Sequence, residues 1–459
     1  WNSALHFEHE RGLAGAIEHC NGQGVCRKTN GVMCPSFQAT REEANSTRGR
    51  ANLLRGLITN YESRNSEYII RNEPLTQATY SALDLCLACK GCTSECPSGV
   101  DMPKLKYEFM NEYYKSHRRP WHDYLFGYFH VVSKWLTPVA PLANALMKMA
   151  WSRKLIAQVM GITDKREFTV FVKGKKVNRY TGKQVNKKGF ALSGAERSRN
   201  AGCVIFLSDV FSRYLEPEVE QAAFDILNAL GYEVKVLPLV GAGASLLSKG
   251  FIDAARRHAG KVLDEIKRFD EGAGLSVVGC EPPEVYCLKH EYAALLPERR
   301  AEIESITKRV WLVDEFILRS GGFDTPREKH AGLLNHQVIF HPHCHQRAEG
   351  LADDGLPSGT SATVEMLTMF GFEVDLIDAG CCGMAGTFGY DAEHYELSMQ
   401  IGELGVLPKF REQRLENRDW SVTSTGSACR MQIKHGIGIE AKHPLELVRD
   451  VLLSKASGG

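Results

Sequence analysis

Three cysteines near residue 90 have the spacing of ligands to an iron–sulfur cube. The run Cys86-Leu-Ala-Cys89-Lys-Gly-Cys92-Thr-Ser-Glu-Cys96-Pro97 has the form C-x2-C-x2-C-x3-C-P. In this pattern three thiolates surround one [4Fe–4S] cluster, and the cysteine before the proline reaches a neighbouring cluster. A zinc ribbon would instead have two separated C-x2-C pairs. The run therefore predicts a [4Fe–4S] cluster at Cys86, Cys89 and Cys92, closed by a cysteine that precedes a proline.

An earlier group of cysteines is an altered copy of this run. Cys20 and Cys26 are six residues apart, as first and third ligands would be, but Gln23 stands at the second position. Cys34, also followed by proline, comes after four extra residues. If the proline-linked cysteines cross over, Cys34 completes the main cluster and Cys96 joins Cys20 and Cys26. This second set could hold a [3Fe–4S] centre, a [4Fe–4S] centre with another ligand, or nothing, in which case Cys96 could close the main cluster.

A third group of cysteines is spread over the C-terminal part of the chain. It consists of Cys344, the adjacent pair Cys381-Cys382, and Cys429. Adjacent cysteines are awkward disulfide partners for each other, and clustered cysteines in a long chain without a secretory leader favour metal binding. We therefore predict a metal ion or cluster at these four residues. The sequence identifies no catalytic residue.

Histidines flank the first cysteine of this third group. His341, His343 and His345 surround Cys344, and we expect His343 and His345 to be auxiliary ligands. The alternative for any one histidine is a surface or capping role. The remaining cysteines lack partners at ligand spacing and are expected to be small buried apolar residues; they are Cys203, Cys280 and Cys287.

A repeated pattern of strands and helices must position the third group. The order strand, helix, strand occurs at 204–207, 216–230 and 233–237, and again at 338–340, 361–370 and 373–377. Loops that follow such strands meet at the carboxyl edge of a sheet. Aligning the two copies places Val210, Gly241, Ala242 and Glu284 opposite Cys344, Cys381, Cys382 and Cys429. Two related α/β lobes are predicted, with metal ligands in the second alone.

The predicted fold class is α+β with several domains. We expect a helical, ferredoxin-like domain for two clusters at 1–118, a helical segment and basic linker at 119–198, a degenerate lobe at 199–330 and a cysteine-bearing lobe at 331–459. Within the first domain, Asp101 before Pro103 predicts the start of a helix that reaches about Tyr114. Capping-box spacing from Thr40 predicts another helix through Leu57.

The segment between the cysteine groups is apolar at first and basic afterwards. Residues 121–160 are expected to form amphipathic helices that pack on the protein, and contact with a membrane surface is the alternative. Residues 164–198 lack the interleaved aromatic residues of a nucleic-acid patch and predict a solvated linker. The net charge of +1 also gives no field that would attract nucleic acid.

Hydropathy and the N-terminus limit where the chain can reside. No stretch of eighteen uncharged apolar residues occurs, so we expect no membrane-spanning helix. No basic region followed by an apolar run begins the chain, so no targeting peptide is expected. Because the chain opens on Trp1, we expect it to be a piece of a longer protein.

Taken together, these motifs resemble the iron–sulfur half of bacterial FAD-linked 2-hydroxyacid dehydrogenases. The similar elements are Met33-Cys34-Pro35-Ser36, Ser46-Thr47-Arg48-Gly49-Arg50-Ala51 and the C-x2-C-x2-C-x3-C-P run. His343-Cys344-His345-Gln346 and Cys381-Cys382-Gly383-Met384-Ala385-Gly386 are similar to the cysteine-rich CCG domain. That domain also occurs in anaerobic glycerol-3-phosphate dehydrogenase, glycolate oxidase and heterodisulfide reductase. The best match is the type that joins flavin and cluster domains in one polypeptide, namely D-2-hydroxyglutarate or D-lactate dehydrogenase.

The resemblance implies an electron-transfer module. FAD, bound by a domain upstream of Trp1 or by a separate flavin subunit, would oxidise D-2-hydroxyglutarate or, as second choice, D-lactate. The clusters would then pass electrons to a quinone or another acceptor. The implied location is the cytoplasm, and peripheral contact with the inner membrane is an alternative. A homo-oligomer is also compatible with the resemblance.

Two features depart from the resemblance. Gly426 stands where the family often has the first cysteine of a final C-x2-C, and the first repeat lacks its CCG element. Chemistry that needs two noncubane clusters is therefore not expected. The alternative functions are a separate iron–sulfur subunit of a glycerol-3-phosphate or glycolate enzyme, and a non-catalytic scaffold stabilised by structural zinc.

Overall fold

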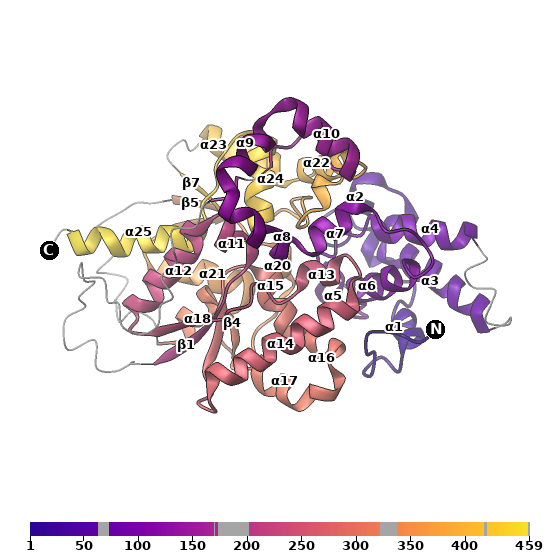
Figure 1. Ribbon diagram of the computed structural model, residues 1–459, viewed down its shortest axis with the longest axis horizontal. Coiled ribbons are helices and arrows are strands. Elements are labelled where there is room, and N and C mark those ends of the chain that lie inside the picture. The colour runs from indigo at the N-terminus through magenta and orange to yellow at the C-terminus, as the bar shows by residue number, and fades with distance from the viewer. Residues whose placement is uncertain (63–72, 169, 173–201, 322–336, 417–419, 458–459) are drawn as a thin grey trace.

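The computed structural model combines a helical N-terminal region with two parallel sheets (Figure 1). It describes residues 1–62, 73–168, 170–172, 202–321, 337–416 and 420–457. In Figure 1 the N-terminal helices lie at the right and the sheets lie toward the left. The carboxyl end of each sheet faces inward, where the cysteines gather.

Six α-helices lie in the part of the N-terminal region that the structure describes. They are α1 (Leu13–Glu18), α2 (Pro35–Thr40), α3 (Thr47–Glu62), α4 (Glu73–Asp84), α5 (Gly91–Glu95) and α6 (Met102–Tyr113). The predicted start of α6 is confirmed, because the Asp101 carboxylate accepts a 3.1 Å hydrogen bond from the Lys104 amide and Pro103 occupies the first turn. The predicted helix start at Thr40 was wrong. Thr40 ends α2, and its hydroxyl donates to the Ser36 carbonyl.

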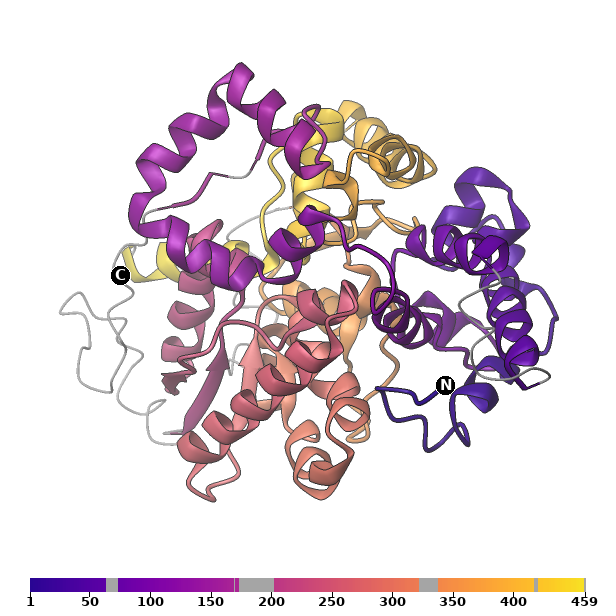
Figure 2. The ribbon, with the colours of Figure 1, turned by 45° about the vertical axis from the view of Figure 1, so that its right-hand side comes forward.

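Four helices follow, of which the last two lie at the top of the molecule in Figure 1 and the first two lie nearer its centre (Figures 1 and 2). They are α7 (Trp121–Gly127), α8 (Phe129–Leu136), α9 (Ala140–Lys148) and α10 (Ala150–Met160). Their inner face buries Phe126 and Ala140. The outer face leaves large apolar side chains in solvent. The helices thus pack on the protein with one face, as expected, and membrane contact by the other face stays an alternative.

The first sheet has the order β2-β1-β3-β4 and the second has the order β6-β5-β7, with all strands parallel. Their strands are β1 (Cys203–Leu207), β2 (Glu233–Val236), β3 (Ser276–Gly279), β4 (Val310–Leu312), β5 (Gln337–His341), β6 (Glu373–Leu376) and β7 (Ser421–Ser424). The registers also match: Val204 pairs with Val234 and Ser276, and Val338 pairs with Val374 and Ser421. The two sheets therefore share order and register over three strands each.

Helices cover both sheets. Those of the first sheet are α11 (Val210–Tyr214), α12 (Pro217–Ala229), α13 (Ala244–Ser248), α14 (Ile252–Asp270), α15 (Pro282–Tyr286), α16 (Tyr292–Leu295), α17 (Arg300–Thr307) and α18 (Val313–Arg319). Those of the second are α20 (Cys344–Ala348), α21 (Gly359–Met369), α22 (Tyr395–Glu403), α23 (Val406–Glu416), α24 (Ser427–Ile437) and α25 (Pro444–Ser457). One apolar core contains Phe206 of β1, Phe340 of β5 and Leu367 of α21. Since each such buried side chain contributes about 1.5–3 kcal/mol, this shared core holds the two sheets together.

The predicted basic connector at 164–198 lies mostly outside the described residues. The described part contains Arg166, which is 1% exposed and donates to the Gly389 carbonyl and the Ser398 hydroxyl. The expectation of a solvated linker was therefore wrong at Arg166. Among the described residues, no helix is long and apolar enough to cross a membrane.

Candidate metal centres

Four buried thiols from distant parts of the N-terminal region gather at one place. Cys34, Cys86, Cys89 and Cys92 are all buried. Burial raises the pKa of the Cys34 thiol to about 11, and the neighbouring charge of Cys86 adds to this effect. Burial also raises the pKa of Cys92 and Cys89 well above the ordinary value, and Cys34 is among the charges that raise each further. These four residues form the main thiol set.

The surroundings of the main thiol set suit a group that bears negative sulfur. The Arg50 guanidinium is buried, and its Nη1 lies 3.9 Å from the Cys34 sulfur. The Thr47 hydroxyl lies 2.9 Å from the same sulfur. Four thiolates are the donors that a [4Fe–4S] cluster uses, and a buried cation beside them offsets their charge. The residues present therefore fit this cluster.

A second thiol set lies on the same domain and is more open. Cys20 and Cys96 are partly exposed, whereas Cys26 is buried. Burial raises the pKa of Cys20, and the charges of Cys26 and Cys96 raise it further. The Cys26 sulfur accepts a 3.3 Å hydrogen bond from the Arg48 amide. The structure thus places Cys96 with Cys20 and Cys26, and Cys34 with the main set, which is the crossed pattern.

The four extra residues before Cys34 are held by a carboxylate that the sequence did not single out. Glu95 accepts hydrogen bonds from the amides of Val32, at 2.7 Å, and Met33, at 3.1 Å. Gln23, in the vacant second position, is exposed. The second set therefore offers three thiols and an open side.

The third thiol set lies at the carboxyl ends of β5, β6 and β7. Cys344 begins α20, Cys381 and Cys382 follow β6, and Cys429 lies in the first turn of α24. The sulfurs of Cys382 and Cys429 are 3.4 Å apart, and Cys381 accepts from the Gly383 amide at the same distance. A hydrogen bond from Cys381 lowers the pKa of Cys344 well below its ordinary value. All four thiols are buried, and hydrogen bonds link Cys344 to Cys381, Cys381 to Cys382 and Cys382 to Cys429.

His341 is the histidine that lies with two thiols of the third set. Ligand atoms of His341, Cys382 and Cys429 all lie within 4.8 Å of one another. The Nδ1 atom of His341 is buried and has no hydrogen-bond partner among the described residues. Two thiols and a free imidazole nitrogen suit a soft or borderline metal, so the residues fit such an ion or cluster. His341 ends β5, and its position beside the predicted ligands could have identified it from the sequence.

Of the two histidines that we expected as auxiliary ligands, His343 lies at the third set and His345 does not. Both ring nitrogens of His343 lie 4.0 Å from the Cys344 sulfur. Although burial lowers it, the pKa of His343 rises to about 9 because of the adjacent Cys344 thiolate. His345 instead places its Nε2 2.9 Å from the Ala88 carbonyl in the ferredoxin loop. The structure thus brings His343 to the third set and turns His345 away from it.

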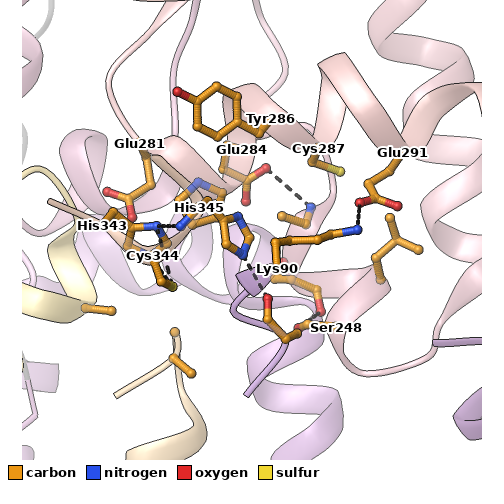
Figure 3. Close-up of a pocket in the computed structure, with 18 of the residues that line it drawn as sticks. Lys90, Ser248, Glu281, Glu284, Tyr286, Cys287, Glu291, His343, Cys344 and His345 are labelled. Atoms are coloured by element: carbon orange, nitrogen blue, oxygen red, sulfur yellow. Dashed lines mark hydrogen bonds and ion pairs between the residues drawn. The ribbon is translucent and has the colours of Figure 1, made fainter. Parts of the chain in front are cut away.

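Two glutamates of the first sheet occupy the equivalent loops. The Glu284 carboxylate accepts hydrogen bonds from the amides of Ala242, at 2.5 Å, and Gly243, at 3.1 Å. It therefore fills the loop that corresponds to the Cys381-Cys382 loop. Glu281 instead crosses to the second sheet, where it accepts a 3.1 Å bond from the Ser427 amide at the start of α24. The sequence analysis missed Glu281; Figure 3 shows it beside His343 and Cys344.

The main and third thiol sets are adjacent. Cys89 and Cys344 belong to one small buried cluster together with Val32. The charge of Cys344 is, after burial, the largest influence that raises the pKa of Cys89. The backbones also approach closely, because a side chain at Gly380 would meet the Gly31 carbonyl at 2.6 Å. This contact gives a short path between the two candidate centres.

Comparison with known proteins identifies the class to which the first two sets belong. Residues 16–100 match the family model of the 4Fe–4S dicluster domain. The N-terminal region is therefore a ferredoxin-type 4Fe–4S domain, as the cysteine spacing predicted.

The chain as a whole also has relatives. It is 27% identical to D-2-hydroxyglutarate dehydrogenase of Pseudomonas putida over 94% of the chain and 43% of that protein. It is 26% identical to the Escherichia coli enzyme of the same name over 95% of the chain. The C subunit of anaerobic glycerol-3-phosphate dehydrogenase from Escherichia coli is 26% identical over 69% of the chain and 73% of its own length. The predicted resemblance is confirmed, and the chain spans less than half the length of the D-2-hydroxyglutarate dehydrogenases it matches.

Proposed function

We propose that this chain is the electron-transfer module of an FAD-dependent D-2-hydroxyacid dehydrogenase, with D-2-hydroxyglutarate favoured over D-lactate. The observation that carries the proposal is the adjacency of the main and third thiol sets through Cys89 and Cys344. The names of the relatives over nearly the whole chain support the substrate. The flavin domain would correspond to the part of those relatives that lies outside the matched region.

Two steps of the proposed reaction use different groups, a flavin and metal centres bound by sulfur. Flavin accepts hydride from a hydroxyacid, and clusters conduct electrons singly. In this chain the main thiol set would hold a [4Fe–4S] cluster, the second set another cluster, and the third set a metal ion or cluster. The third set lies in the cysteine-bearing lobe at 331–459, and Glu284 takes the place of metal in the related lobe at 199–330.

A second candidate is a separate iron–sulfur subunit of a glycerol-3-phosphate or glycolate enzyme. The similarity to the C subunit of glycerol-3-phosphate dehydrogenase, over 73% of its length, favours this candidate. Residues encoded immediately before Trp1 discriminate the two, because a continuous flavin domain there excludes a separate subunit. The zinc-scaffold alternative is tested by metal analysis, since it requires zinc without acid-labile sulfide.

We also propose that the chain works in the cytoplasm, on the inner face of the membrane, with a quinone as acceptor. Trp121, Trp135 and Trp151 on the outer face of α7–α10 are 69%, 75% and 62% exposed. Residues 124–163 contain four Lys or Arg and no Asp or Glu. Exposed tryptophan with basic and without acidic residues is typical of helices that lie on anionic lipid. Homo-oligomerisation stays a prediction, which light scattering would test.

The central experiment replaces one ligand of the main set. Cys89→Ser should lower iron and sulfide content and slow electron delivery to an external acceptor in the full-length enzyme. Reduction of the flavin by D-2-hydroxyglutarate should persist, because hydride transfer does not need the cluster. Cys203→Ser, at a thiol distant from all three sets in sequence, is the matched control. Loss of flavin reduction in a folded Cys89→Ser enzyme would contradict the proposed division of roles.

A further inference from the structure

A cavity of about 400 Å³ lies where the N-terminal region, α7, α8 and the loops of both sheets meet. This volume falls within the range of small-molecule sites, about 300–1,000 Å³. Its wall includes Leu87 of the ferredoxin loop, Phe126 of α7, Phe129 of α8 and Phe211 of α11. The wall is thus largely aromatic and aliphatic, which suits a flat, apolar molecule.

One end of the cavity reaches the third thiol set. Cys344 and His343 both line it, and Figure 3 shows them side by side below Glu281. Cys344 in turn touches Cys89 of the main set. A molecule in the cavity would therefore lie against the point where the two candidate centres meet.

The charges in the cavity exclude the anionic hydroxyacid as its occupant. Among the described residues that line it, Lys90 is the single Lys or Arg, and it already pairs with Asp101, at 3.0 Å, and Glu291. Glu281 and Glu284 add further carboxylates. The His343 imidazole, whose pKa the Cys344 thiolate raises to about 9, already lies against that sulfur. A dicarboxylate here would therefore meet buried acids without an unpaired cation. An uncharged occupant is favoured.

The helices that carry the exposed apolar face also form part of the cavity wall. Phe126 and Phe129 form part of the wall, and they lie on the same two helices as the exposed Trp121 and Trp135. The helices that would contact a membrane therefore line the same cavity as Cys344 and His343.

We propose that this cavity binds the ring of a membrane quinone, the electron acceptor; the inference rests on the proposed function. Oxidation of one hydroxyacid to the keto acid releases two electrons and two protons. The quinone takes up the two electrons, delivered singly through the metal centres, and two protons from water, and becomes the quinol. The quinone is the oxidant, and no other co-reactant is needed.

The test is photolabelling of the purified, anaerobic chain with a short-chain azidoquinone, followed by peptide mapping. Label should appear on peptides from α7, α8 or residues 281–291. Ala244 lines the cavity, so Ala244→Phe should lower labelling about tenfold by filling the space. Ala273 is exposed in the turn after α14, and Ala273→Phe is the matched control. Phe211→Ala, which removes part of the wall, should weaken quinone binding even if Ala244→Phe misfolds.

Turnover of the full-length enzyme separates this inference from the proposed function. Ala244→Phe should abolish quinone reduction while reduction of ferricyanide, a small hydrophilic acceptor, persists. Labelling that is confined to other peptides, or equal in Ala244→Phe and Ala273→Phe, would overturn the quinone site and leave the electron-transfer module standing. Absence of iron and sulfide from the chain would overturn the proposed function itself.

Discussion

Cys89 is the residue through which the first domain meets the third thiol set. It is buried with Cys344, and His345 fastens the same loop by its contact with the Ala88 carbonyl. Because both side chains are enclosed, the distance between the two centres is fixed by packing and not by a mobile loop. If Cys89 is a cluster ligand, as its spacing predicts, one thiol would also be the point at which the main set meets the third.

Gln23 tests whether the second thiol set is one ligand short. Gln23→Cys restores the missing second position and should raise iron content or convert a three-iron signal to a four-iron signal. The side chain is exposed, so the substitution should cost little stability. Iron analysis and electron paramagnetic resonance measure the outcome. Thr29→Cys, in the inserted loop, adds a thiol away from ligand spacing and should change neither; identical results for both variants would show that the second set binds no cluster.

Cys382 and Glu284 test whether the third centre belongs to one lobe. In a background without the ferredoxin cysteines, Cys382→Ser should empty the third site, because thiolates supply most of the affinity. Glu284→Ala should leave bound metal nearly unchanged, since Glu284 binds amides of its own loop. It should lower the free energy of unfolding by about 1–3 kcal/mol, because buried amides lose their acceptor. Equal metal loss in the two variants would contradict a site confined to the second lobe.

At the scale of elements, α7–α10 have two faces with different tasks. The inner face closes the cavity with Phe126 and Phe129, and the outer face presents tryptophan to solvent. An exposed apolar surface of this kind on a protein marks an interaction site. Residues 124–163 contain no Asp or Glu. A protein interface usually has a polar rim with charges of both signs, so this surface favours lipid as its partner.

Replacing tryptophans on this face should release the chain from membranes. The double variant Trp135→Ser, Trp151→Ser should bind anionic vesicles at least about tenfold more weakly, since each buried apolar side chain contributes about 1.5–3 kcal/mol. Co-sedimentation with vesicles measures this, and binding by the unaltered chain should fall with added salt because of Lys134, Lys148 and Lys154. Leu351→Ser, at another exposed apolar side chain, is the control. Unchanged sedimentation of the double variant would contradict the membrane surface.

At the scale of the whole molecule, a buried charge network joins the N-terminal region to both sheets. His394 contacts Asp84 of α4 at 2.8 Å and Asp391 at 3.3 Å. Lys249, from the first sheet, pairs with Asp391 at 3.3 Å and with Asp123 of α7 at 3.0 Å. The N-terminal region, α7 and the first sheet's part of the chain thus contribute one charged residue each to this junction, and the second sheet's part contributes two.

This junction predicts a loss of stability at alkaline pH. Burial lowers the pKa of His394, but its bonds to Asp391 and Asp84 raise it overall to about 9. The charged imidazole therefore contributes stability that is complete below its ordinary pKa of about 6.5 and is lost as the pH rises through about 9. The loss should be on the order of 3 kcal/mol. Unfolding by urea at pH 6 and pH 10 should show this difference, and His394→Gln should remove it; the same pH dependence in both proteins would exclude His394 as its source.

The sequence alone determined the features that depend on neighbouring residues. The spacing of Cys86, Cys89 and Cys92 specifies three ligands of one cluster, because a few residues of chain limit where their sulfurs can lie. Asp101 predicts the start of α6 for the same reason, since its cap acts three residues away. Two strands of each sheet were likewise predicted from short apolar runs, and β1, β2, β5 and β6 begin and end within a residue of the predicted bounds.

Only the tertiary structure decided which distant residues meet. In the structure Cys34 lies with the main set. His341 lies at the third set, whereas His345 contacts the ferredoxin loop. Glu281, from the first sheet, accepts a hydrogen bond from the Ser427 amide. The fold also buries Arg166, which local composition assigned to a solvated linker. Such contacts join residues that are tens to hundreds of positions apart, and they depend on how the sheets pack on their shared core. The spacing of residues within a motif carries no information about that packing. The motifs therefore predict which cysteines are ligands, and the fold determines which other residues surround those cysteines.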